Sequence, residues 1–345
     1  MKHFLVFTKF LILIFFFLSS KYSHAQSKSG LHLIKKTTIG GNGFWDYVSV
    51  DSQSRHLYLS HSNQVEVLNA DTHKKIGVIT ETKGVHGVIE IPGMGKGFTT
   101  NGKTNTSTIF DTKTFKKIAE LPTGDIPDAL LYDAFSGYVF IFNNEGGSAT
   151  VIDSKTNKVV KTIELGGAPE AGVTNEKGLI FVNLEDKNEI VAFDSKDFSI
   201  KHRFKLAPGE EPTGLAIDLV KNILFSGCHN QLLIVVDASN GNILAKLPIG
   251  KGVDGVVYDP KSKLVICSNG EGTITLIKEK SANEFAVLET IPTHPGARTI
   301  GIDAKTNHIF LPAGKAGPAP APTKENPKPW PSILPNTFMV LEFGI

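Results

Sequence analysis

The sequence predicts an all-β protein, a seven-bladed β-propeller built from four-stranded antiparallel blades. Three observations predict it. Similar segments recur along the chain with steps of 40, 42, 42, 43, 41 and 44 residues. Each segment holds four short runs rich in Val, Ile, Phe and Leu, separated by turn residues. A spare run precedes the first segment, and the last segment is one run short. A period near 40 with four strands per unit is typical of propeller blades.

The strands follow from the residues within each segment. In the third segment the four runs read ALLYD, YVFIF, ATVID and KVVKTIEL, and such runs with tight turns between them are typical of antiparallel strands. The last segment ends at NTFMVLEFGI without a fourth run, so we expect the strand LHLIKKTTI at 31–39 to complete that blade. Closing the ring in this way removes two exposed strand edges. The first residues of the seven segments are here called the anchors: Asp46, His86, Asp128, Glu170, Thr213, Asp254 and Arg298.

Residues 1–25 read as a cleaved secretory signal. Lys2 and Lys9 accompany an unbroken apolar run at 11–18, and a small-x-small cleavage site at Ala25 precedes Gln26. The apolar run is too short for a membrane anchor, and no later stretch approaches a membrane span. We therefore expect a secreted or periplasmic protein in which residues 26–345 form one domain and act as a monomer.

The charge balance limits the classes of partner. Without the lysines of the signal, the formal charge falls from +2 to −1, with 33 basic against 34 acidic residues. A nearly neutral domain lacks the broad basic surface that non-specific nucleic-acid binding uses, so a nucleic-acid partner is not expected. The sequence contains no G-x-S-x-G, H-E-x-x-H or C-x-x-C-H motif, which argues against serine hydrolases, zincins and c-type haem proteins.

The third segment also resembles a known repeat. TVIDSKTNKVVKTIELGGAPE (150–170) resembles the YVTN-type repeat, and residues 31–345 are similar to YncE-like seven-bladed propellers. The resemblance implies the propeller fold and export, but no single activity, because such relatives include surface-layer proteins and a group implicated in DNA binding. The chain departs from the pattern in the sixth blade, where LIKEKSANEFAVLETI replaces the usual Asp and Thr turn, and in the second, where Ile91 replaces an Asp.

The anchors are expected to form a polar ring where the central channel opens. The innermost strands of the blades converge on the channel, where side chains must be small, and the residue after the anchor is Gly or Ala in five of the seven segments. An anchor therefore begins its strand at the hydrated opening and not in the core. The ligand-binding candidates in this ring are Asp46, His86, Asp128, Glu170, Asp254 and Arg298. The alternative interpretation is a hydrated ion-pair network that keeps the blades in register.

A second polar tier is expected from the loops between the second and third strands, which reach the same face. The polar residues fifteen positions after an anchor, together with the residue that follows Cys228, supply it: His61, Asn101, Asn143, Asn269 and His229. Cys228 and Cys267 match no metal or redox spacing. They are either a disulfide, which export would permit, or two buried thiols.

The ring also offers metal ligands. Asp128 and Glu170 come from adjacent blades, and two like charges close together raise one pKa or attract a cation. With Asp254 they are the candidate metal ligands, and Asn101 or Asn143 would add oxygen donors that suit calcium. His86 is a candidate acid/base or a zinc ligand. No motif demands a cofactor, and calcium or zinc is the cofactor that the ring would hold.

These features predict a binding scaffold that uses one face for a small molecule, a metal or a protein partner. The alternative is a metal-assisted, lactonase-like hydrolase with a carboxylate-bound cation at the channel opening and His86 as its acid/base. An insertion, AGKAGPAPAPTKENPKPWPSILPN at 313–336, interrupts the seventh blade on the same face. Its prolines favour an extended conformation. It is expected to be either a semi-rigid lid that presents Trp330 or a loop packed along one blade.

Overall fold

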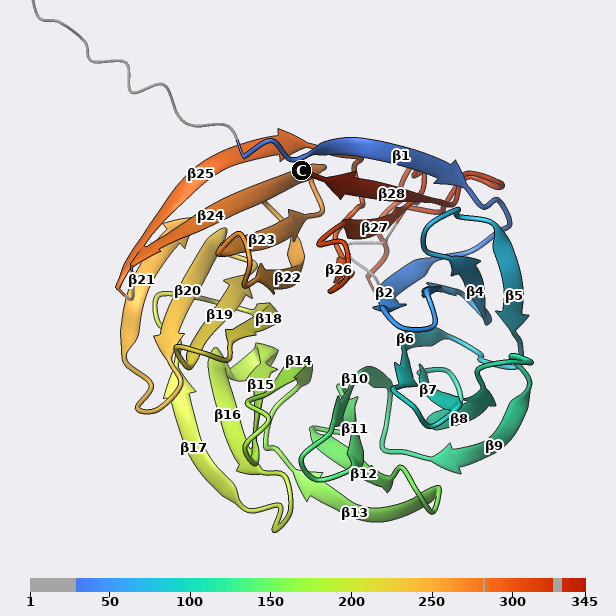
Figure 1. The fold of residues 1–345 in the computed structure, drawn as a ribbon, viewed down its shortest axis with the longest axis horizontal. Coiled ribbons are helices and arrows are strands. Elements are labelled where there is room, and N and C mark those ends of the chain that lie inside the picture. The colour runs from blue at the N-terminus through green and yellow to red at the C-terminus, as the bar shows by residue number, and fades with distance from the viewer. Residues whose placement is uncertain (1–28, 282, 325–330) are drawn as a thin grey trace, which may run out of the picture.

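The computed structural model describes residues 29–281, 283–324 and 331–345. Seven four-stranded antiparallel sheets surround a central channel, so the fold class predicted from the sequence is confirmed (Figure 1). The predicted signal at 1–25 and Trp330 lie outside the described residues. In the part of the chain that is described, no helix is long and apolar enough to cross a membrane.

The strands of the first four blades, from the channel outwards, have these bounds. Blade 1 holds β2 (Trp45–Asp51), β3 (His56–His61), β4 (Gln64–Asn69) and β5 (Lys75–Ile79). Blade 2 holds β6 (Val85–Ile91), β7 (Lys96–Asn101), β8 (Thr106–Asp111) and β9 (Lys117–Pro122). Blade 3 holds β10 (Pro127–Asp133), β11 (Tyr138–Asn143), β12 (Ser148–Asp153) and β13 (Lys158–Glu164). Blade 4 holds β14 (Pro169–Thr174), β15 (Leu179–Leu184), β16 (Glu189–Asp194) and β17 (Ile200–Lys205), with a single-turn 3₁₀ helix, η1 (Glu185–Lys187), after β15.

The last three blades follow the same order. Blade 5 holds β18 (Pro212–Asp218), β19 (Ile223–Cys228), β20 (Leu232–Asp237) and β21 (Ile243–Pro248). Blade 6 holds β22 (Val253–Asp259), β23 (Leu264–Asn269), β24 (Thr273–Ser281) and β25 (Glu284–Pro292). Blade 7 holds β26 (Gly301–Ile302), β27 (Ile309–Ala313) and β28 (Met339–Gly344), and its outermost strand is β1 (His32–Thr38) from the other end of the chain.

The pairing of β1 with β28 closes the ring as predicted. Thr38 lies opposite Met339 and His32 opposite Gly344, with one register shift between them. Figure 1 shows β1 running along the outside of β28. A buried ion pair joins the same two ends of the ring, because Arg55 of blade 1 donates to Asp303 of blade 7 at 2.9 Å. Neither end of the repeat array is therefore left as an open sheet edge at this junction.

Packing between neighbouring blades builds the core. Phe140 of blade 3 meets Phe193 of blade 4 edge-on, and Phe225 of blade 5 stacks on Tyr258 of blade 6. Near the channel the inner strands approach so closely that a side chain on Gly214 would meet the backbone nitrogen of Val256 at 2.7 Å. This contact is the physical reason for the small residues that follow the anchors.

The two cysteines have separate places in this core. Cys228 ends β19 and Cys267 lies in β23, and each is a buried free thiol. The structure therefore favours the interpretation as small buried side chains over the disulfide.

Candidate functional site

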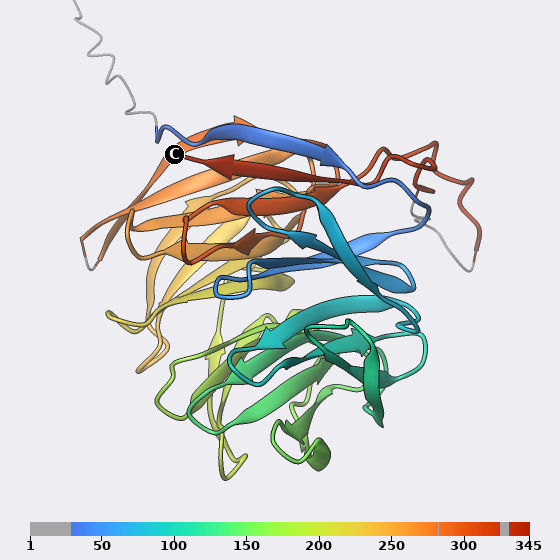
Figure 2. The same ribbon diagram turned by 45° about the vertical axis from the view of Figure 1, so that its right-hand side comes forward.

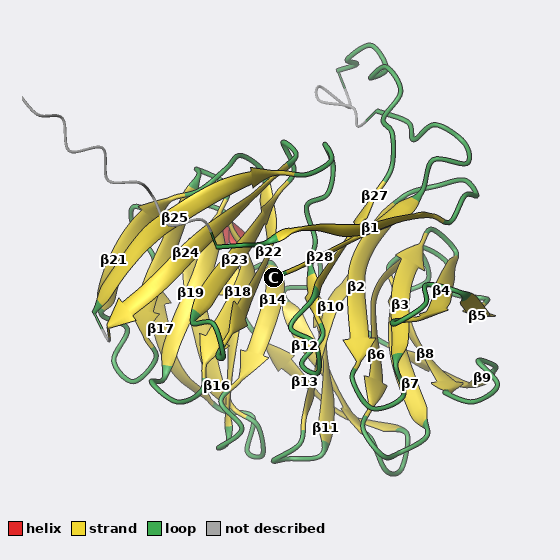
Figure 3. Ribbon diagram, turned by 45° about the horizontal axis from the view of Figure 1, so that its top comes forward, coloured by secondary structure: helices red, strands yellow, loops and turns green. Residues whose placement is uncertain are grey.

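A large cavity occupies one face of the propeller, here called the funnel face. Its volume is about 1960 Å³, against roughly 300–1,000 Å³ for typical small-molecule sites. The floor is formed by the first residues of the inner strands, and the walls by the loops between second and third strands. The segment between β27 and β28 adds a further wall. It extends beyond the strands at this end of the molecule (Figures 2 and 3).

All seven anchors line this cavity. Six of them are the second residue of an inner strand, and Arg298 lies shortly before β26. In these six strands the pairing with the next strand shifts register just at or after the anchor, for example between Trp45 and Val48 and between Pro127 and Leu130. Such bulges re-aim side chains. The bulge therefore turns a polar side chain into the cavity at the start of a strand whose remainder is buried.

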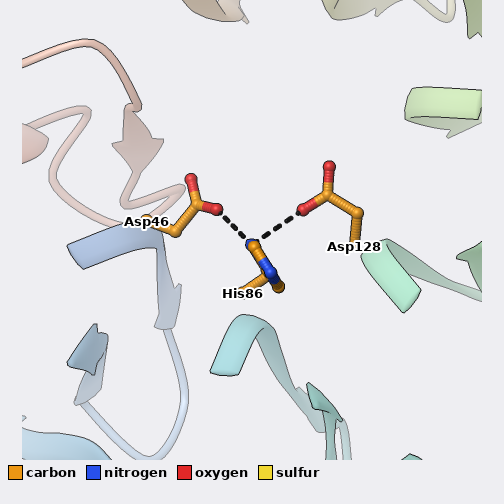
Figure 4. Close-up of side chains that lie close together, drawn as sticks. All are labelled: Asp46, His86 and Asp128. Atoms are coloured by element: carbon orange, nitrogen blue, oxygen red, sulfur yellow. Dashed lines mark hydrogen bonds and ion pairs between the residues drawn. The ribbon is translucent and has the colours of Figure 1, made fainter. Parts of the chain in front are cut away.

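Asp46, His86 and Asp128 form a compact group on blades 1, 2 and 3. The Nδ1 atom of His86 lies 2.7 Å from Oδ2 of Asp46 and 3.2 Å from Oδ1 of Asp128. Figure 4 shows the imidazole placed between the two carboxylates. Burial lowers the pKa of His86, but the hydrogen bond to Asp46 and the charge of Asp128 outweigh it and raise this pKa above its ordinary value. His86 therefore keeps a positive charge more readily than a free histidine.

Arg298 neutralises the two carboxylates that flank it. Its guanidinium donates to Asp254 of blade 6, and its second nitrogen lies 3.4 Å from Asp46 of blade 1. Burial raises the pKa of Asp46, yet Arg298 and His86 more than compensate and hold this pKa below its usual value. Arg298, Asp254 and Asp46 thus form an ion-pair bridge across the junction of the first and last blades. This part of the ring is consistent with the alternative interpretation, in which the anchors form an ion-pair network that keeps the blades in register.

Among the described residues, Asp128 and Glu170 on the opposite side of the ring have no lysine or arginine partner, and Asp128 shares His86 with Asp46. Burial, followed by the charge of Asp46, raises the pKa of Asp128 to about 7. Burial, followed by the charge of Asp128, raises the pKa of Glu170 well above its usual value. Asn144 donates to Oε1 of Glu170 at 2.8 Å. These two carboxyls are therefore the least compensated groups of the floor.

The second tier is displaced by one residue from its predicted position. His61, Asn101, Asn143 and Asn269 are each the last residue of a second strand, and all four are buried. Successive side chains of a strand point to opposite sides, so these four point into their blades. The cavity is lined instead by the residues one position later in six blades and by Glu185 in blade 4: Ser62, Gly102, Asn144, Glu185, His229, Gly270 and Gly314.

The buried residues of the predicted tier have structural partners. Asn143 donates from Nδ2 to Ser148 and Thr150 at 3.1 and 3.0 Å. Asn101 and Asn269 make the equivalent bonds in their own blades. His61 lies 3.2 Å from Glu66. The structure therefore places these four side chains inside the blades and away from the cavity, whereas His229 lines it.

The predicted metal ligands do not gather on one point. Within the described ranges, two groups of three or more His, Cys, Asp or Glu residues have ligand atoms within 4.8 Å of one another: Asp46, His86 and Asp128, and Glu185, Glu211 and His229. Asp128, Glu170 and Asp254 are not such a group, because the ring spreads their blades apart. The donors that could hold an ion are thus Asp128 with His86 and Asp46.

Tyr47 and Glu185 line the cavity, but they were not among the candidate site residues predicted from the sequence. Tyr47 of blade 1 packs against the core of blades 3 and 4, so its ring crosses the channel below the cavity. Burial and the charges of Asp128 and Glu170 raise its pKa well above its usual value. Tyr47 could have been found in the sequence, because it is a large residue at the position after the anchor, where most blades have Gly or Ala. Glu185 was missed because blade 4 is one residue shorter between its anchor and the end of its second strand, so that β15 already ends at Leu184 and residue 185 begins η1.

Apolar side chains surround the polar floor. Phe44, Ile126 and Leu334 line the cavity with 52%, 39% and 42% of their surface exposed. Ile126 has a φ of 46°, which is strained for a β-branched residue. Leu334 belongs to the predicted insertion, which is pinned where Gly317 donates to Ser332 at 2.7 Å. The described part of this segment lines the cavity wall.

Comparisons with known proteins support the fold. No protein-family model and no curated protein matches the sequence. A chain of Kuenenia stuttgartiensis hydrazine synthase is similar, with 13% identity over 80% of this chain and 93% of that chain and a TM-score of 0.69. A chain of a mitotic checkpoint complex has 12% identity over 98% of both chains and a TM-score of 0.74. U3-55K has 10% identity over 90% of this chain and 98% of that chain, with a TM-score of 0.74. At such identities the similarity shows the propeller fold alone.

Proposed function

We propose that this protein is a binding protein that takes a small molecule into the cavity of its funnel face. The observation that carries the proposal is the cavity itself, in which a polar, charged floor lies beneath an apolar rim. Small-molecule sites typically combine apolar walls with a few convergent polar groups. Propellers often serve as rigid scaffolds for such sites, because the loops at one end of the blades can vary while the sheets stay fixed.

The test is a thermal melt of residues 26–345 with a set of small charged and uncharged fragments. A ligand bound only by the folded state stabilises that state in proportion to the logarithm of its excess over Kd. We expect some fragments to raise the Tm of the wild type more than that of the double variant Lys103→Trp/Lys251→Trp, whose indoles narrow the cavity from exposed positions on two walls. Lys158→Trp on the exposed strand β13 is the matched control. No shift with any fragment, or a shift of the same size in the double variant, would contradict the proposal.

A metal-assisted hydrolase is the second candidate, and the Asp46–His86–Asp128 group favours it. These residues offer one nitrogen and two carboxylate oxygens within 4.8 Å of one another, a donor set that suits zinc. His86 already bonds to Asp46 through Nδ1, so an ion would have to replace this bond. A melt that falls with EDTA and recovers with zinc or calcium would favour this candidate over the binding protein.

We further propose that the protein is an exported propeller of the YVTN-repeat, YncE-like type. The repeat at 150–170 and the signal at 1–25 support this proposal. Export predicts that the protein recovered from the periplasm or the medium begins at Gln26. An intact mass that still includes residues 1–25 would contradict it.

A further inference from the structure

The charges of the floor are distributed unevenly around the ring. Arg298 of blade 7 lies between Asp254 and Asp46 of its two neighbouring blades and pairs with both. Blades 3 and 4, which carry Asp128 and Glu170, lie across the channel from blade 7 (Figure 1). Among the described residues, no lysine or arginine pairs with Asp128 or Glu170, and His86 is the one cation beside Asp128. On this side His86 is therefore the one described cation for two carboxyl groups, and it also pairs with Asp46.

Asp128 and Glu170 also each have a carboxylate oxygen that lacks a hydrogen-bond donor among the described residues. Oδ1 of Asp128 is shielded from solvent and accepts no hydrogen bond from the described residues. Glu170 is only 8% exposed. Its Oε1 accepts from Asn144, and no described donor reaches its Oε2. Buried carboxylates normally have hydrogen-bond donors. A ligand that carries N–H donors and a positive charge would supply what both groups lack.

The rim above this side is apolar. Ile126 lies two residues before Asp128, at the cavity wall, and keeps a strained backbone with its side chain exposed. Phe44 before blade 1 and Leu334 of the blade 7 insertion expose apolar surface elsewhere on the cavity wall. Exposed apolar groups around a cavity are typical of ligand sites. A bare metal ion has no part that would contact this surface, whereas an organic ligand does.

Building on the proposed function, we propose that the ligand is an organic cation whose ammonium or guanidinium group binds between Asp128 and Glu170, while its apolar body rests against Ile126. The carboxylates provide acceptors for the N–H groups, and the apolar wall removes hydrocarbon surface from water. An anionic ligand would face the uncompensated carboxylates and is disfavoured. Arg298 is already bonded to Asp254 and Asp46 and does not offset this repulsion.

The test compares three probes that share a phenyl ring: 2-phenylethylamine, 2-phenylethanol and 3-phenylpropionate. Each is titrated calorimetrically into residues 26–345, with calcium chloride as a fourth titrant. We expect the amine to bind most tightly. Asp128→Asn and Glu170→Gln should each weaken the amine by about 10- to 100-fold, because a hydrogen bond to a charged group contributes roughly 1.5–3 kcal/mol. Glu164→Gln, an exposed carboxylate on β13 away from the cavity, is the matched control and should change affinity by less than about 3-fold.

The apolar part of the site has its own variant. Ile126→Gly keeps the positive φ that this position requires. It should weaken 2-phenylethylamine and leave methylamine unchanged, because methylamine has no apolar body to contact the wall. A melt of each variant checks that it is folded before titration.

The outcomes separate this inference from the proposed function. Tighter binding of the alcohol or the acid, or amine binding that Asp128→Asn and Glu170→Gln leave unchanged, would overturn the organic cation while the cavity still binds a small molecule. Calcium binding that these two variants abolish, without amine binding, would replace the organic cation by a metal ion. If no probe binds and no fragment shifts the melt, both the inference and the proposed function are wrong.

Discussion

Replacing Asp128 by Asn should reduce the loss of stability that we expect for the wild type between about pH 4 and pH 7, a loss to which the raised pKa of Glu170 also contributes. The pKa of Asp128 is raised to about 7 in the folded protein from an ordinary value of 3.8. In this pH window the folded state binds a proton that the unfolded state has lost, so the stabilisation is complete below pH 4 and disappears as the pH rises through 7. A shift of this size corresponds to roughly 4 kcal/mol, at 1.36 kcal/mol per pKa unit.

The measurement is urea unfolding at several pH values for the wild type and for Asp128→Asn. His86, whose pKa is also raised, adds a loss of the same sign at higher pH, above its ordinary value of about 6.5. Asp125→Asn is the matched control, because Asp125 is an exposed carboxylate on the same loop. If Asp128→Asn retains the wild-type slope between pH 4 and pH 7, Asp128 is not the uncompensated carboxyl of the floor.

Replacing Arg298 by Met should destabilise the protein by about 3 kcal/mol at pH 7. The guanidinium lies against Asp254 and Asp46, whose side chains are 15% and 14% exposed. Removing one partner of a buried ion pair leaves an uncompensated buried charge, which costs about 3–5 kcal/mol. The lower end of this range applies because 29% of the Arg298 side chain faces the hydrated cavity.

A double variant shows whether Arg298→Met destabilises the protein through an unpaired carboxylate or through lost packing. The double variant Arg298→Met/Asp254→Asn should recover most of the stability at pH 7, because the unpaired carboxylate is then gone. Arg203→Met on blade 4 is a matched control. Arg203 pairs with Glu189, which also has Lys205 as a partner, so its loss should cost less than about 1 kcal/mol. Urea unfolding gives all three values, and an unchanged stability of Arg298→Met would exclude the ion-pair bridge.

Much of the fold could be predicted because the same four-strand pattern occurs seven times in the sequence. The period fixes the number of blades, and the spare strand at 31–39 pairs with the final strand, as closure requires. The anchors could be located because a charge at the start of an apolar strand needs a hydrated surface. The small residues after them indicated the crowded channel, and the contact of Gly214 with blade 6 confirms that crowding.

The site was harder to predict because it depends on geometry that the repeat does not encode. The predicted second tier included Asn143 although Asn144 faces the cavity, since a shift of one residue along a strand reverses the direction of the side chain. Periodicity also cannot say which anchors compensate each other. Blade order in the closed ring already places Arg298 between Asp254 and Asp46, but the pairing itself, and the contrast with Glu170, come from the side-chain contacts.

The account depends most on the cavity between Asp128, Glu170 and the apolar rim. The most direct measurement is an X-ray structure of residues 26–345 grown with 2-phenylethylamine. The account predicts one molecule in the cavity, with its nitrogen within hydrogen-bond distance of Asp128 or Glu170 and its ring against Ile126. An empty cavity, a ring turned towards the floor, or a metal ion held by Asp46, His86 and Asp128 in place of the amine would contradict it.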